Sequence, residues 1–107
     1  MSGTPHTKRE RYDDRRATRD LAVQLSIRKY HSNLYGFLAG QGPVRPVGLT
    51  FTFRERGDWI AIAKGFRADD GERVVCFGSG DDLWASLAGL NSAIGLGKWV
   101  RDKYAYS

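Results

Sequence analysis

Three consecutive stretches in the middle of the chain have the residue pattern of β-strands. Leu49, Phe51 and Phe53 alternate with Thr50, Thr52 and Arg54, which is the period of a half-buried β-strand. Residues 59–66 place Ile60 and Ile62 on one face and Ala61 and Ala63 on the other, and residues 73–77 place Val75 and Phe77 on one face and Val74 and Cys76 on the other. Gly57-Asp58 separates the first two stretches, and the turn-forming sequence of residues 68–71 separates the last two. The pattern therefore predicts an antiparallel meander.

A helical period follows the third predicted strand. Four apolar residues recur at steps of four, three and four and form one stripe: Leu83, Leu87, Leu90 and Ile94. Ser79 with Asp82 three residues later matches a helix capping pattern, and Gly95 and Gly97 favour a helix end. We expect an amphipathic helix whose stripe covers one face of the sheet.

The stretch before the meander fits two periods. Its apolar residues alternate as in a strand over residues 21–28, yet they also recur at helical spacing over residues 23–37. Strands are favoured because His31-Ser32-Asn33 is typical of a turn and Gly36 is unfavourable inside a helix. We predict a hairpin, Leu21–Tyr30 and Leu34–Ala39, with a helix as the alternative.

The predicted fold class is thus α+β, with an antiparallel sheet of four to five strands and one C-terminal amphipathic helix on one face. Residues 21–107 have the size of a single domain. Residues 1–20 carry six Lys or Arg against four acids, and no large aliphatic residue after Met1. Such a segment cannot offset its ordering entropy, so we expect a flexible basic arm.

The turn length decides which residues share a face of the sheet. If Gly57-Asp58 is a two-residue turn, Arg56 lies opposite Trp59 and Arg54 opposite Ala61. The predicted core face then holds Leu49, Phe51, Phe53, Ile60, Ile62, Phe66, Val75 and Phe77. The opposite, exposed face holds Thr50, Thr52, Arg54, Arg56, Trp59, Ala61, Ala63, Val74 and Cys76.

The composition predicts where the protein works. There is no apolar run long enough for a transmembrane helix, and the charged N-terminus does not resemble a secretory signal. Cys76 is the single cysteine, which excludes an internal disulfide and fits a reducing compartment. We expect a cytoplasmic protein without a membrane partner.

Catalytic, cofactor and metal motifs are not recognisable in this sequence. His6 and His31 lie outside any catalytic motif, and Cys76 falls in the middle of a predicted strand, where a buried thiol is inert. The glycine-rich stretch 78–80 precedes Asp81-Asp82, whose charges would repel a phosphate at the helix N-terminus. The acids do not follow the calcium-loop spacing. We predict no enzyme activity, no cofactor and no metal site.

Basic and aromatic residues are the positive functional signal, since 17 Lys and Arg against 12 Asp and Glu give a net charge of +5. Arginine and lysine neutralise phosphates, and indole rings stack on bases. The candidate nucleic-acid-binding residues are Arg54, Arg56, Trp59, Lys98, Trp99, Arg101 and Lys103. The hypothesis is non-catalytic, sequence-tolerant binding of nucleic acid, preferably single-stranded DNA.

The alternative is a small structural or adaptor subunit that binds a protein partner, or forms a homodimer, through its exposed sheet face. The predicted order of elements, an antiparallel meander followed by one amphipathic helix after a basic arm, resembles that of Whirly-type single-strand DNA-binding proteins. This resemblance is one of architecture, and fold alone does not imply function. No residue role is therefore carried over.

Overall fold

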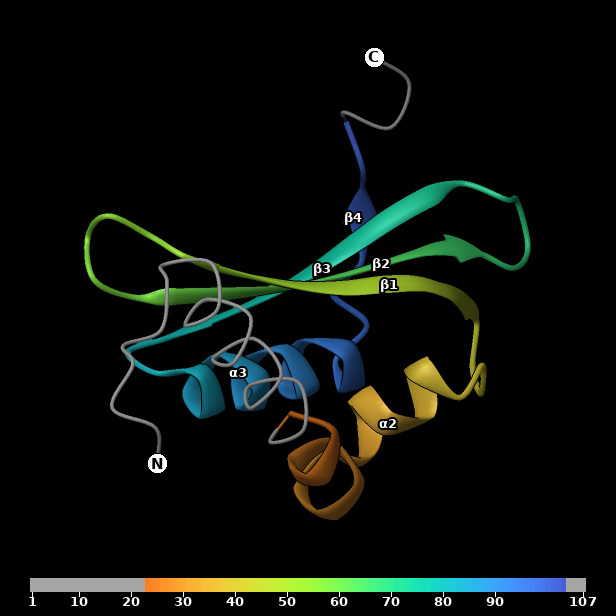
Figure 1. The fold of residues 1–107 in the computed structure, drawn as a ribbon. Coiled ribbons are helices and arrows are strands. Elements are labelled where there is room, and N and C mark those ends of the chain that lie inside the picture. Colours follow the sequence, from red (N-terminus) through yellow and green to blue (C-terminus); the bar gives the residue numbers. More distant parts are fainter. Residues whose placement is uncertain (1–22, 104–107) are drawn as a thin grey trace, which may run out of the picture.

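The computed structural model describes residues 23–103 and forms a four-stranded antiparallel sheet with helices on one side (Figure 1). The strands pair in the order β1-β2-β3-β4. After a helical stretch over residues 23–30, the elements are α2 (Ser32–Leu38), β1 (Val44–Phe53), β2 (Trp59–Arg67), β3 (Arg73–Gly80), α3 (Leu83–Gly95) and β4 (Val100–Arg101). The predicted α+β meander with a C-terminal helix is confirmed. The predicted arm, residues 1–20, lies outside the described residues.

The hairpin predicted for residues 21–39 is wrong, because residues 23–30 and 32–38 are helical. Val23, Ile27, Leu34 and Phe37 are all buried in the core cluster, whereas Leu25 is 61% exposed. The buried side chains therefore recur at helical spacing and not at every second position. The turn-like residues around His31 separate two helical segments instead of two strands.

The predicted two-residue turn between β1 and β2 is also wrong. Phe53 lies opposite Trp59, so the connection is a five-residue loop over residues 54–58. The Arg54 N–H donates to the Asp58 carbonyl oxygen at 2.8 Å, and Gly57 has a φ of 92°, a conformation that suits glycine. Phe53 thus occupies the position opposite Trp59 that was predicted for Arg56, and the register differs from the predicted one by three residues. Because side chains alternate between the two faces of a sheet, an odd shift moves every residue of β2 and β3 to the other face relative to β1.

The face of the sheet that α3 covers is consequently built from small residues. We call it the helix-covered face, and its members are Leu49, Phe51, Phe53, Trp59, Ala61, Ala63, Val74, Cys76 and Gly78. The predicted stripe of α3 is correct, since Leu87 and Leu90 are fully buried and Leu83 and Ile94 pack partly against the core. Its partners are Ala61, Ala63 and Cys76 on the sheet, not the predicted isoleucines.

The opposite face, which we call the open face, carries larger apolar residues and cations. Its members are Thr50, Thr52, Ile60, Ile62, Lys64, Phe66, Arg73, Val75, Phe77 and Val100. In the part of the chain that the structure describes, the helices lie on the other side of the sheet (Figure 1). Within the same range, no helix combines the length and apolar character that crossing a membrane requires.

Candidate nucleic-acid interface

The seven predicted binding residues lie in three separate places. Arg54, Arg56 and Trp59 lie in or beside the β1–β2 loop, Lys98 and Trp99 follow α3, and Arg101 and Lys103 lie on and after β4. The β1–β2 loop and β4 lie toward opposite edges of the sheet, since β1 and β4 are its two outer strands. The seven residues therefore do not form one surface.

The two loop arginines are bound to an acid of the same loop. The Arg54 Nε donates to Asp58 Oδ1 at 2.8 Å, and an Arg56 guanidinium nitrogen lies 3.0 Å from Asp58 Oδ2. These hydrogen bonds, from Arg56 and then Arg54, hold the pKa of the Asp58 carboxyl well below its usual range. Because one carboxylate already faces both guanidinium groups, we expect the loop to bind phosphate weakly.

The two predicted stacking indoles pack against the protein's own rings. Trp59 is half-buried, and its ring centroid lies 5.3 Å from that of Phe53 on the helix-covered face. Trp99 packs against the core, with its centroid 5.0 Å from that of Phe37 on α2. Their contacts give both indoles a structural role.

Arg101 and Lys103, in contrast, line a groove on the open face. The groove has a volume of about 530 Å³, and its lining combines an apolar floor with a cationic rim. The lining residues are Ile62, Lys64, Arg73, Val75, Phe77, Val100, Arg101, Asp102 and Lys103. Four cations and one carboxylate therefore surround an apolar surface that helix packing does not cover.

One aromatic ring and several charged side chains line this groove. The ring of Phe77 is 46% exposed. The Arg73 guanidinium carbon lies 5.1 Å from the centroid of Phe66, a cation–π distance. Arg101 Nε lies 2.5 Å from an oxygen of Glu72, and this ion pair ties β4 to the beginning of β3. The groove thus presents an exposed ring between side chains that can contact phosphates.

Sequence reasoning missed Lys64, Arg73 and Phe77, because the predicted register placed Phe77 in the core. A signal for the correct face was present in the small residues. Ala61, Ala63 and Gly65 alternate along β2, as Cys76, Gly78 and Gly80 do along β3. Two neighbouring strips of small residues are typical of a surface that another backbone approaches closely.

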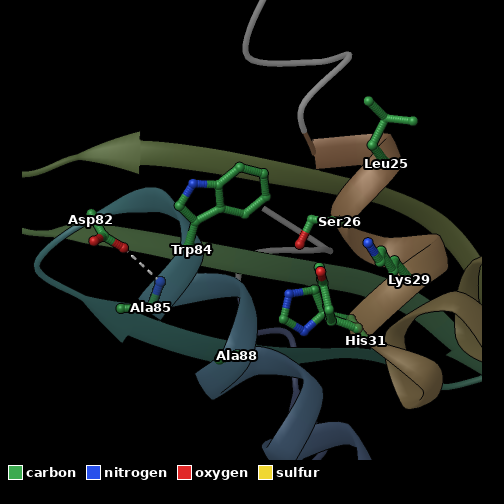
Figure 2. Close-up of a pocket in the computed structure, with 9 residues that line it drawn as sticks. Leu25, Ser26, Lys29, His31, Asp82, Trp84, Ala85 and Ala88 are labelled. Carbon is green, nitrogen blue, oxygen red and sulfur yellow. Dashed lines mark hydrogen bonds between the residues drawn. The ribbon is translucent and has the colours of Figure 1, made fainter.

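A second cavity lies on the other side of the sheet, between residues 25–31 and the start of α3 (Figure 2). It has a volume of about 750 Å³, and Leu25 and Trp84, which is 46% exposed, face it from opposite helices. Asp82 caps α3 here by accepting the Ala85 N–H at 2.8 Å, in the place of the predicted Ser79 cap. Lys29 is the one cation among the lining residues, so this cavity suits an apolar group and not a polyanion.

The histidine and the cysteine within residues 23–103 are both buried. Burial lowers the pKa of His31 and raises the pKa of the Cys76 thiol, so both are neutral near pH 7. Among residues 23–103, no three His, Cys, Asp or Glu side chains form a group that could hold a metal ion. The groove on the open face is therefore the strongest candidate site in the described part of the chain.

Comparisons of this chain with family models, with curated proteins and with solved structures found no match.

Proposed function

We propose that the open face binds single-stranded nucleic acid without sequence preference. The observation that supports this most is the cationic rim of Lys64, Arg73 and Lys103 around the exposed ring of Phe77. Proteins that bind single strands in this way combine a cationic groove along the backbone with aromatic rings on which bases stack.

Each part of the groove supplies a different component of such binding. Lys64, Arg73 and Lys103 contact phosphates and provide affinity that depends on salt. The ring of Phe77 stacks on a base, and because every base has a π-face this contact is tolerant of sequence. Ile62 and Val100 extend the apolar surface beside the ring.

A single strand fits this surface better than a duplex. The ring of Phe77 lies on the face of a sheet, so a base must leave its own stack to contact it. Unpaired bases do this at low cost, whereas paired bases first lose their partners. We therefore expect the affinity for a single strand to exceed that for a duplex of the same sequence.

The test is fluorescence anisotropy with labelled oligothymidylate at low and high salt, in the parent and three variants. Phe77→Ala should lose about 1–3 kcal/mol of binding, the range of one stacking aromatic. Arg73→Ala should weaken binding and flatten its salt dependence. Arg56→Ala removes the same charged group from the loop, where Asp58 already engages it, and should change affinity little.

Three results would contradict the proposal. These are an absence of binding to single-stranded DNA and RNA at low salt, an unchanged affinity in Phe77→Ala, and an equal loss in Arg56→Ala and Arg73→Ala. The first of these, together with binding to a protein partner that hardly responds to salt, would favour the adaptor function. Phe77 and Val100, about half exposed, would then be apolar contacts of a protein interface.

A further inference from the structure

The two edges of the sheet differ in how they resist pairing with another strand. The β4 edge is two residues long, and Lys98, Arg101 and Lys103 lie on or beside it. Short strands and charges are devices by which proteins protect a sheet edge. The β1 edge is ten residues long, and residues 49–53, with the sequence Leu-Thr-Phe-Thr-Phe, carry no charge.

The outward backbone groups of β1 follow from its pairing with β2. Arg54 donates its N–H to the carbonyl oxygen of its opposite residue, Asp58, so these two form a hydrogen-bonded pair. Such pairs alternate along an antiparallel ladder, which directs the backbone groups of Thr50 and Thr52 toward β2. Leu49, Phe51 and Phe53 consequently direct their N–H and C=O groups outward, where no other described strand pairs with them.

The part of the β1 edge that can pair with another strand has two limits and a midpoint. It ends at Arg54, where the loop begins, and at Gly48, where a register shift between Pro46 and Gly48 interrupts the ladder. Phe51 is the midpoint of residues 49–53. Around it the pattern is symmetric: threonines at positions 50 and 52, and large apolar residues at positions 49 and 53.

We propose that a second copy of this chain pairs antiparallel with β1, with the two-fold axis at Phe51. Thr50 then faces Thr52 of the partner subunit on the open side, and Leu49 faces the partner's Phe53 on the helix-covered side. Thr–Thr pairs and pairs of large apolar residues are favourable across strands. The outward groups of Phe51, Leu49 and Phe53 all gain hydrogen-bond partners.

A second copy fits this edge because the pattern is complementary to itself. A two-fold interface needs every residue to meet an acceptable partner from the same short sequence, and an uncharged, symmetric five-residue strand meets that condition. Phe53, which is 58% exposed in one chain, gains a neighbour across the axis. The paired sheets would be continuous, so the two open faces would lie side by side.

The experiment measures the mass of the chain in solution without nucleic acid, by sedimentation equilibrium over a range of concentrations. The parent should reach twice the 12.0 kDa of one chain. Thr50→Lys/Thr52→Lys places ammonium groups opposite one another in both symmetric pairs and should weaken dimerisation by about tenfold or more. Thr50→Lys/Thr52→Glu places opposite charges in the same pairs and should remain dimeric.

A matched control adds the same charge elsewhere. Ser79→Lys/Ser92→Lys changes two exposed serines on β3 and α3 and should dimerise like the parent. The proposal is wrong if the parent is monomeric throughout, or if the double-lysine variant dimerises as the parent does. It is also wrong if the lysine–glutamate variant is monomeric while folded by circular dichroism. Because nucleic acid is absent, none of these results depends on the proposed function.

Discussion

The two faces of the sheet distribute apolar residues in opposite ways. The helix-covered face, apart from Leu49 and the aromatic residues near the ends of β1 and β2, consists of Ala, Gly, Cys and Val, whereas the open face holds Ile60, Ile62, Phe66 and Phe77. Size alone would place the larger residues in the core. The contrast shows that the face with the smaller side chains is the one that α3 covers.

The close approach of α3 explains the small residues. A Cβ placed on Gly78 would lie 2.0 Å from the backbone nitrogen of Leu90 and 2.4 Å from the carbonyl oxygen of Ser86. A helix this close to the strand supplies its own large side chains, Leu87 and Leu90, to fill the core. On the open face no such neighbour exists among the described residues, and Ile60, Ile62, Phe66 and Phe77 remain partly exposed.

The largest expected effect is the loss of a large side chain from α3. Leu87→Ala should lower the free energy of unfolding by about 2–5 kcal/mol, because Leu87 is fully buried and its removal leaves a cavity. Ile62→Ala, on the open face and half-buried, should cost clearly less. Urea denaturation of both variants measures the difference. A larger loss in Ile62→Ala would reverse the assignment of the faces.

A smaller effect is expected from adding one methyl group beneath α3. Gly78→Ala should cost about 3 kcal/mol, toward the upper end of overpacking effects, because the atoms it meets are helix backbone. Gly48→Ala is the matched control, since a Cβ there has no neighbour within 4 Å. Denaturation curves of the two alanine variants provide the comparison. Equal stabilities would mean that α3 does not approach β3 this closely.

The smallest effect concerns pH and the buried histidine between the helical segments. Burial lowers the pKa of His31 in the folded state. The unfolded chain, whose histidine has a pKa of about 6.5, therefore binds a proton more readily than the folded chain does. The contribution of neutral His31 to the free energy of unfolding is fully present above that pH and decreases as the pH falls below it. His31→Gln should show a smaller loss of stability between about pH 7 and 5.5 than the parent. Parallel slopes would contradict this.

The sequence patterns predicted the meander and the stripe of α3, because both depend on local periods. Two features depended on contacts that no local pattern reveals. Residues 23–37 satisfy a strand and a helical period, and packing into the core cluster favours the helix, since Ile27 is buried and Leu25 is exposed. The second feature is the β1–β2 loop, in which Arg54 and Arg56 both bind Asp58, and the alternating pattern does not predict these contacts.

The lining of the candidate groove was likewise predicted in part. Arg101 and Lys103 were identified from local composition, and they line the groove. Lys64, Arg73 and Phe77 were missed because the predicted β1–β2 register determined which residues of β2, and then of β3, were assigned to the core face. A three-residue error in one turn thus moved these residues away from the predicted binding face.

The most direct test of the binding proposal compares the methyl groups of the two faces by NMR during titration with oligothymidylate. Ile60, Ile62, Val75 and Val100 report on the open face, and Leu87 and Leu90 report on the core beneath α3. We expect chemical-shift changes that concentrate in the first group and spare the second. Changes confined to Leu25 and the cavity beside Trp84, or no changes at low salt, would contradict it.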